Sequence, residues 1–210
     1  FTFVTPARAQ VTYSVNKEWV RIWINKDGSI DIQYNITYTY LSGSPAGIFR
    51  LGMPKGGFQI NYVKDISGSS LQFDDVSGGN YYGIDVYLKN RPPPLYVQNT
   101  FIVYAIVPGM IYPDNTNPGN VGMLFYPATS EDAVGSADLR VAIVLPEGVN
   151  STSVKHPTRA EWNSNGTDID THNLYVYWES PNWPPGQTFT SGVSFPEKYV
   201  SLAPSGLFDF

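Results

Sequence analysis

The sequence predicts an all-β fold, built as an antiparallel β-sandwich. Apolar and polar residues alternate with a period of two in several segments, which is typical of strands with one solvated face. Clusters of Gly, Pro, Asn and Ser separate these segments, and no stretch of the sequence shows a convincing helical period. Many strands, frequent breaks and cores of β-branched and aromatic residues favour a sandwich with Greek-key connections.

The clearest element is a β-hairpin. In its first strand, Val20, Ile22 and Ile24 alternate with Trp19, Arg21 and Trp23. In its second strand, apolar residues alternate with the polar residues Asp31, Gln33, Asn35, Thr37 and Thr39; the apolar residues are Ile30, Ile32, Tyr34, Ile36, Tyr38 and Tyr40. Between them, Lys26-Asp27-Gly28-Ser29 supplies residues that favour a tight turn. We therefore expect a long second strand with one wet face.

Further strands are expected along the rest of the chain. They are Phe58 to Val63, Tyr82 to Leu88, Tyr96 to Val107, Val121 to Tyr126, Leu139 to Leu145, Leu174 to Trp178 and Thr188 to Phe195. Arg91-Pro92-Pro93-Pro94 is the best candidate for an internal boundary, because consecutive prolines form a stiff, extended connector. We interpret it as a crossover between sheets, with a division into two domains as the alternative.

The composition points to the cell exterior. Charged residues make up 15% of the 210 residues, against roughly 25% in an average soluble domain. Ser, Thr, Asn, Gly and Tyr must therefore cover most of the surface. The net charge is −5 and the basic residues are scattered, which argues against nucleic acid as a partner. The chain contains no Cys, so it has neither disulfides nor thiolate metal ligands.

The sequence offers little material for catalysis. Histidine occurs twice, at His156 and His172, and there is no Gly-x-Ser-x-Gly motif. Carboxylates are paired at Asp74-Asp75, at Glu131-Asp132 and at Asp168 and Asp170, but all lie in polar, loop-like segments where solvation is the usual state. The oxygen-rich stretch Asp114 to Asn117 lacks the spacing of an EF-hand loop. We therefore expect no enzyme activity, catalytic residue, metal or cofactor.

Two short patterns indicate sugars. Trp162, Trp183, Tyr81 and Tyr82 fall in or beside predicted loops, where exposed rings stack on pyranose rings in many sugar-binding sandwiches. This observation supports a secreted carbohydrate-binding module as an alternative function. Three sequons, which begin at Asn35, Asn150 and Asn165, predict N-glycosylation. Asn35 belongs to the polar face of its strand, and the other two lie in predicted loops.

The segment from Phe1 to Ala9 has the character of an extended, apolar arm. Its sequence resembles the end of a signal peptide, yet as a strand it would reach roughly 30 Å at about 3.3 Å per residue. Phe1, Phe3 and Val4 are costly to leave in water, so we expect them to fill a groove on a neighbouring subunit by donor-strand complementation. Pairing as an edge strand within the same domain is the main alternative. This division gives a donor segment, 1–10, and a sandwich domain, 11–210.

The Cys-free, Tyr-, Asn- and Thr-rich composition, the sequons, the signal-like Phe1 to Ala9 and the β pattern from Val11 to Phe195 together resemble archaeal thread-type pilins. The resemblance implies an immunoglobulin-like or pilin-like β-sandwich with an N-terminal donor strand. It also implies a glycosylated subunit that joins copies of itself head to tail in an extracellular cell-surface filament. Such a filament would serve adhesion or biofilm cohesion.

A second resemblance concerns the predicted hairpin. The segments Asn25 to Ile32 and Tyr34 to Tyr38 resemble the start of the ectodomain in a family of uncharacterised predicted membrane proteins. An ectodomain is therefore a further alternative function. The longest apolar runs, Phe101 to Val107 and Leu139 to Leu145, are far shorter than the roughly 20 residues of a transmembrane helix.

Overall fold

The computed structural model describes residues 10–127, 133–157 and 160–202. These residues form strands joined by turns and loops, with two short 3₁₀ helices, η1 (Ser151–Ser153) and η2 (Glu197–Tyr199). The strands are β1 (Thr12–Ile24), β2 (Ile30–Ser42), β3 (Ile48–Gly52), β4 (Gln59–Asp65), β5 (Phe73–Asp75), β6 (Gly83–Tyr87), β7 (Gln98–Val107), β8 (Tyr112–Pro113), β9 (Asn120–Phe125), β10 (Ala137–Val144), β11 (Ser164–Thr167), β12 (Leu174–Trp183) and β13 (Ser191–Pro196). The prediction of an all-β fold is confirmed.

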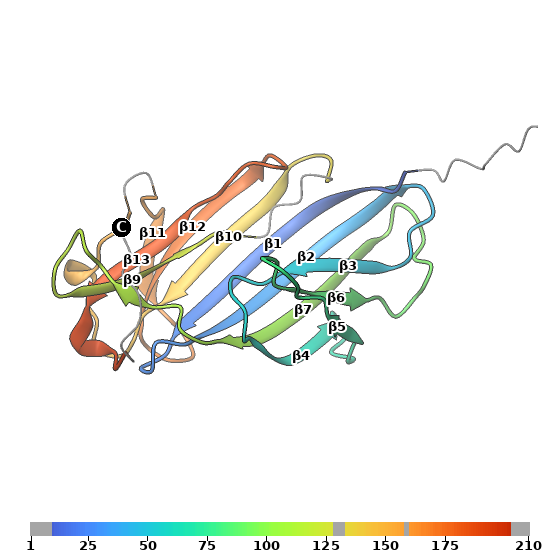
Figure 1. The fold of residues 1–210 in the computed structure, drawn as a ribbon. Helices are drawn as coiled ribbons and strands as arrows, with labels where there is room; N and C mark the ends of the chain where they lie inside the picture. The colour runs from blue at the N-terminus through green and yellow to red at the C-terminus, as the bar shows by residue number, and fades with distance from the viewer. Residues whose placement is uncertain (1–9, 128–132, 158–159, 203–210) are drawn as a thin grey trace, which may run out of the picture.

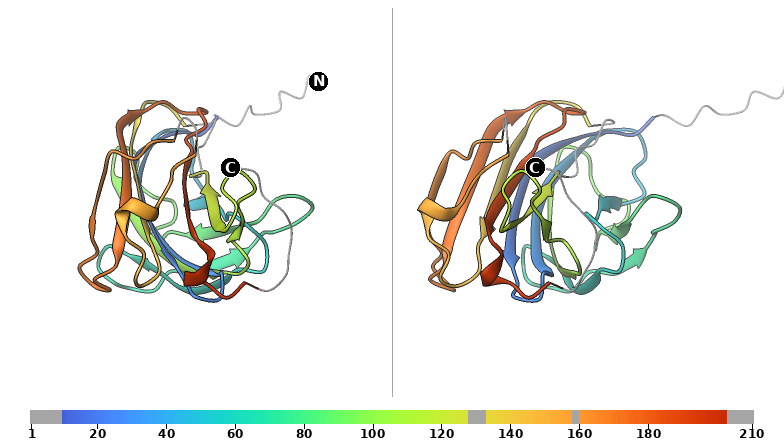
Figure 2. Two further views of the ribbon diagram at one scale, coloured as in Figure 1. Left: turned by 90° about the vertical axis from the view of Figure 1, so that its left-hand side faces the viewer. Right: turned by 60° about the vertical axis from the view of Figure 1, so that its left-hand side comes forward.

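One large sheet and two small sheets make up the architecture. The large sheet has seven strands in the order β11-β12-β10-β1-β2-β7-β4, and the small sheets have the orders β13-β9-β8 and β3-β6-β5. The large sheet curves around the two small ones, which lie against one of its faces (Figures 1 and 2). We call this covered face the inner face and the opposite one the outer face.

The pairing of the strands is antiparallel except at the centre of the large sheet. There β1 and β10 run parallel, with Lys17 to Trp23 opposite Asp138 to Val144. The sheet is therefore mixed, which differs from the uniformly antiparallel arrangement that we expected. A parallel pair needs a long crossover connection. The chain between β2 and β10 provides it, and this part of the chain contains every strand of the two small sheets except β13.

The predicted hairpin is confirmed as β1 and β2. In its turn the Asp27 carboxylate accepts hydrogen bonds from the main-chain N–H and the hydroxyl of Ser29, at 2.9 and 2.7 Å. Gly28 adopts a φ of 80°, a value that favours glycine. A bulge at Asn16 shifts the register of β1, so that Glu18, Val20, Ile22 and Ile24 face inward beyond it while Trp19, Arg21 and Trp23 face outward.

All seven further strands that we expected are present as β4, β6, β7, β9, β10, β12 and β13, with small differences at their ends. Four short strands were not predicted: β3, β5, β8 and β11. The last of these, Ser164-Asn165-Gly166-Thr167, contains no apolar residue from which a pattern could be read. The segment from Arg91 to Pro94 connects β6 in a small sheet to β7 in the large one, so the predicted crossover between sheets is confirmed.

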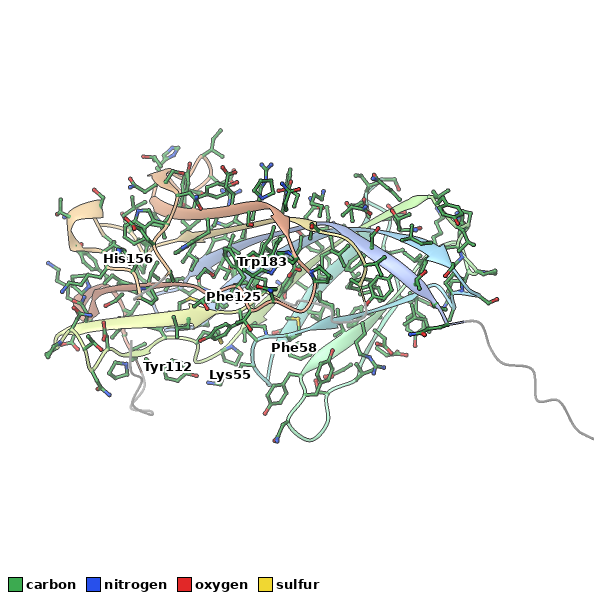
Figure 3. All side chains as sticks on the ribbon, turned by 90° about the horizontal axis from the view of Figure 1, so that it is seen from above. Lys55, Phe58, Tyr112, Phe125, His156 and Trp183 are labelled. Carbon is green, nitrogen blue, oxygen red and sulfur yellow. The ribbon has the colours of Figure 1, made fainter. Side chains whose placement is uncertain are left out.

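The core fills the space between the inner face and the small sheets as one continuous cluster. Aromatic rings join the layers: Tyr34 lies 6.4 Å from Phe125 of β9, and Tyr38 lies 4.5 Å from Phe49 of β3, between ring centroids. Figure 3 shows Phe125 near the middle of the molecule. Burial raises the pKa of the Tyr34 and Tyr38 phenols well above the ordinary value, so both stay neutral in the core.

Candidate binding surface

The outer face of the large sheet carries three rows of side chains, most of them aromatic, charged or amide. Each row crosses the sheet because residues directly opposite one another on neighbouring strands project from the same face. From β12 to β4 the rows are Tyr177-Ala142-Arg21-Gln33-Tyr104-Tyr62, Glu179-Arg140-Trp19-Asn35-Ile102-Lys64 and Tyr175-Val144-Trp23-Asp31-Ile106-Gln59. Solvated faces of antiparallel sheets are usually polar, so this concentration of Trp and Tyr is unusual.

Cations are packed over the two tryptophans of β1. The ammonium of Lys17 lies 4.7 Å and the guanidinium of Arg140 lies 4.5 Å from the centre of the Trp19 ring. Arg21 lies 4.8 Å from the centre of the Trp23 ring. Each contact contributes about 0.5–1 kcal/mol at an exposed site, and together they fix the orientation of both indoles. Trp19 nevertheless remains 37% exposed.

Carboxylates anchor the same arginines. Arg21 forms ion pairs with Asp168, which is 2% exposed, and with Asp170 at 3.2 Å. Arg140 pairs with Asp138 at 3.0 Å, and that carboxylate also accepts a 3.0 Å hydrogen bond from the Trp19 indole N–H. Burial raises the pKa of Asp168, but hydrogen bonds from Arg21 and Thr171 outweigh this effect and hold the pKa below the ordinary value. The charges of this surface are therefore largely balanced.

Tyrosines extend the surface toward both edges of the sheet. The Tyr62 and Tyr104 rings are stacked, with centroids 5.3 Å apart and planes 13° apart. Burial and the hydrogen bond that Tyr104 donates to Asp31 raise the pKa of Tyr104 to about 12. Burial and the bond to Glu179 likewise raise the pKa of Tyr177 to about 12. Both hydroxyls therefore remain protonated at physiological pH.

Two hollows lie side by side on this surface. One, of about 280 Å³, is bounded by Trp19, Arg140 and Asn35, and the other, of about 350 Å³, by Tyr175 and the turn at 167–169. Both are lined by Arg21, Ala142 and Tyr177. Within the described residues, the side-chain oxygen of Asn35 is buried without a hydrogen-bond partner.

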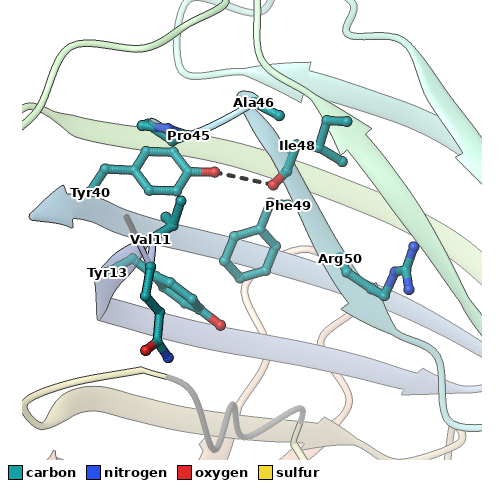
Figure 4. A pocket seen from close by; sticks show the side chains of 9 residues that line it. Val11, Tyr13, Tyr40, Pro45, Ala46, Ile48, Phe49 and Arg50 are labelled. Carbon is teal, nitrogen blue, oxygen red and sulfur yellow. Dashed lines mark hydrogen bonds between the residues drawn. The ribbon is translucent and has the colours of Figure 1, made fainter. Parts of the chain in front are cut away.

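A third hollow, which we call the end pocket, lies at the end of the large sheet where β1 begins. It measures about 430 Å³ (Figure 4). Its lining is mostly apolar: Val11, Tyr13, Tyr40, Pro45, Ala46, Ile48 and Phe49, with Gln10 and Arg50. The Tyr40 hydroxyl donates a 3.1 Å hydrogen bond to the main-chain oxygen of Ile48, which ties β2 to β3 beside the pocket.

The predicted donor residues Phe1, Phe3 and Val4 lie outside the described residues. Of the three sequon asparagines, Asn150 and Asn165 are exposed, at the start of η1 and in β11. Asn35 is half-buried in the middle of the outer face, and its sequon threonine, Thr37, is 6% exposed. Glycosylation at the three positions stays a prediction.

The loop aromatics do not form one platform. Trp162 packs edge-on against His156 and Trp178, at 5.3 and 6.4 Å between ring centroids, and so belongs to the margin of the core. Trp183 packs against Phe189 at 5.0 Å, and Figure 3 shows it well apart from His156. Tyr81 and Tyr82 lie just before β6 and are 39% and 40% exposed. The aromatic residues of the outer face were missed because they alternate with core residues inside strands.

The candidate carboxylates that lie in the described residues have structural partners. Asp74 accepts a 2.6 Å hydrogen bond from the Tyr87 hydroxyl, and Asp75 accepts one of 2.8 Å from the Ser77 N–H. Asp114 closes its own loop and accepts a bond from Ser194 at 2.5 Å. In the described ranges, no group of three or more His, Asp or Glu side chains is placed to hold a metal ion.

Comparison with known proteins identifies a family. Residues 14–195 match the family described as "Predicted membrane protein (DUF2207) N-terminal domain". This description indicates a location at the membrane or cell envelope. The described residues contain no helix long and apolar enough to cross a membrane. No curated protein matches the chain.

Solved structures share the fold at low sequence identity. An M1 zinc metallopeptidase from Deinococcus radiodurans is 12% identical with a TM-score of 0.57, and the match covers 92% of this chain and 44% of the peptidase. Yeast LTA4 hydrolase in complex with bestatin is 11% identical with a TM-score of 0.57, and the match covers 88% of this chain and 29% of the hydrolase. The chain spans less than half the length of either protein, and the likeness is one of fold.

Proposed function

Because the chain belongs to the family of N-terminal domains of predicted membrane proteins, we propose that it is the extracytoplasmic recognition domain of a membrane protein. The low content of charged residues and the two exposed sequons support a position outside the cytoplasm. The domain has no catalytic role in this proposal. It binds a component of the cell surface through the outer face of its large sheet.

The outer face is the observation that carries this proposal. Trp, Tyr and Arg are the residue types most enriched at the energetic centres of binding interfaces. Here they lie on β12, β10 and β1, which are neighbours in the sheet, and on β7 and β4 beyond β2; cation–π contacts and ion pairs stabilise the arginines and tryptophans among them in the unbound domain. A rigid, preorganised surface loses less conformational entropy on binding than a mobile one.

Binding to intact cells tests the proposed role of this face. The labelled domain is compared with the double variant Trp19→Ala/Trp23→Ala and with Tyr126→Ala, which removes a ring that is 53% exposed and directly follows β9, a strand of a small sheet. We expect the double variant to bind about 30-fold more weakly or worse, because the loss of a Trp anchor that is buried in an interface costs about 2 kcal/mol or more. Equal binding by all three folded proteins would contradict the proposal.

The extracytoplasmic position is tested by cysteine labelling, since the chain has no native Cys. Ser69→Cys places a thiol in an exposed turn, and Val63→Cys places one at a position that is 2% exposed. In intact cells that produce the full-length protein, a membrane-impermeant maleimide should label Ser69→Cys and spare Val63→Cys. If Ser69→Cys is labelled only after lysis, the domain faces the cytoplasm.

A filament subunit is the second candidate, and the end pocket is the observation that favours it. In this proposal the chain is a pilin-like subunit whose Phe1, Phe3 and Val4 enter the end pocket of the next copy, so that head-to-tail contacts build an adhesive extracellular filament. N-glycans would coat its surface at Asn150 and Asn165, and at Asn35 on the outer face.

Electron microscopy and size-exclusion chromatography test the filament. Intact protein should form filaments, whereas a variant without residues 1–9 and an Ala46→Arg variant, which places a charge in the end pocket, should remain monomeric. Monomers from the intact protein, or filaments from the truncated one, would rule the donor strand out.

A further inference from the structure

We propose that the two hollows on the outer face form one groove that binds a neutral oligosaccharide. This inference rests on the proposed recognition function and names the ligand class for the same surface. The shape of the groove, its charge and its hydrogen-bonding groups support this ligand class.

The groove is continuous because the two hollows share Arg21, Ala142 and Tyr177. Ala142 has the smallest side chain of its row, and it lies between Arg21 on β1 and Tyr177 on β12. The short methyl group leaves a trough between two long neighbours. The combined space runs from Trp19 and Asn35 at one end to Tyr175 at the other, which suits an elongated ligand rather than a single small molecule.

The charges along the groove select against ionic ligands. Arg21 is paired with Asp168 and Asp170, and Arg140 is paired with Asp138. An anion that bound either guanidinium would have to compete with a carboxylate already in place, and a cation would lie beside the Arg21 and Arg140 guanidiniums that line the groove. A neutral ligand meets neither penalty.

The remaining groups match the two-sided chemistry of a sugar. Tyr175 and Tyr177 offer apolar rings against which the C–H faces of a pyranose can pack, and Trp19, whose ring carries Lys17 and Arg140, forms the wall at the other end. The Asn35 oxygen is a buried acceptor without a donor, a state that costs about 1–3 kcal/mol. Asn35 lines the groove, so a sugar hydroxyl placed beside its amide could supply the missing donor. Apolar walls with a few placed polar groups are typical of ligand sites.

Calorimetric titration tests this proposal on protein made in a host without N-glycosylation, so that Asn35 is unmodified. The probes are cellohexaose, chitohexaose and mannohexaose, with an anionic hyaluronan hexasaccharide for comparison. We expect at least one neutral probe to bind and hyaluronan to bind more weakly. Ala142→Leu fills the trough without removing a contact of the core, and it should weaken binding about tenfold or more.

The control is Tyr126→Ala, which should bind like the wild type. Absence of binding by every neutral probe, preference for hyaluronan, or unchanged affinity in folded Ala142→Leu would each overturn the inference. If no sugar binds while attachment to cells still depends on Trp19 and Trp23, the saccharide inference fails and the recognition function stands. If attachment to cells is also independent of these residues, both proposals fail.

Discussion

Removal of Arg21 is expected to destabilise the sheet and to do so mainly above pH 4. Arg21→Ala leaves the Asp168 carboxylate, which is 2% exposed, without its guanidinium partner. Asp168 keeps hydrogen bonds from the Thr171 N–H and hydroxyl, both 2.9 Å, and the Arg21 side chain is 32% exposed, so water replaces part of the lost interaction. The cost should therefore lie below the 3–5 kcal/mol of a fully buried pair. The lost contact to Trp23 adds about 0.5–1 kcal/mol. We therefore expect Arg21→Ala to lower the free energy of unfolding by about 3 kcal/mol in all.

Urea denaturation followed by circular dichroism measures this change, and thermal melts should show a fall in Tm of about 6–12 °C. Because the pKa of Asp168 is lowered in the folded protein, its ion pair contributes above the unfolded pKa of about 3.9 and the contribution is lost as the pH falls through the folded value. The difference in free energy of unfolding between the wild type and Arg21→Ala should therefore become smaller below pH 4. Arg21→Lys should cost about 1 kcal/mol. A cost below about 0.5 kcal/mol for Arg21→Ala at pH 7, or no recovery of stability when Asp168→Asn is added, would show that the ion pair does not stabilise the fold.

Three further substitutions test the packing and the pH response. Phe49→Ala should cost about 3–4 kcal/mol in urea denaturation, because its ring joins β3 to the aromatic cluster of the large sheet, and a cost under about 1 kcal/mol would contradict that role. Gly192→Ala should cost about 1–3 kcal/mol, since a Cβ there would lie 2.6 Å from the main-chain oxygen of Met123; an unchanged Tm would show that β9 and β13 yield easily. The bidentate hydrogen bond from Arg50 lowers the pKa of Asp85, so this pair stabilises the fold above about pH 4 and the effect is lost as the pH falls through the folded pKa. Asp85→Asn should thus cost about 1 kcal/mol at pH 7 and progressively less as the pH falls below about 4, and a cost that does not depend on pH would count against this ion pair.

The sequence revealed the strands whose burial differs between their two faces. Val20, Ile22 and Ile24 alternate with Trp19, Arg21 and Trp23, and the structure places the first set in the core and the second on the outer face. Strands without such a difference left no pattern: β11 is polar throughout, and all three residues of β5 are exposed. Their place in a sheet depends on neighbours that are distant in the sequence.

The candidate site was harder to predict than the fold. A strand with Trp on one face and Val or Ile on the other signals an unusual surface, but the sequence cannot say which strands lie beside it. The row that contains Trp19 exists because β1 pairs in parallel with β10, which brings Arg140 next to the indole. Sequence reasoning instead singled out Trp162, whose ring packs against Trp178 at the margin of the core.

A chemical block of the outer face of the large sheet shows directly whether this face is the binding surface. Gln33→Cys introduces a single thiol in the middle of the face, beside Arg21 and Tyr104, and Tyr126→Cys introduces one away from it. Each protein is modified with a bulky maleimide polymer and its binding to intact cells is measured. Modification should abolish binding by Gln33→Cys and leave binding by Tyr126→Cys unchanged. Equal binding by the two modified proteins would show that this face is not the binding surface.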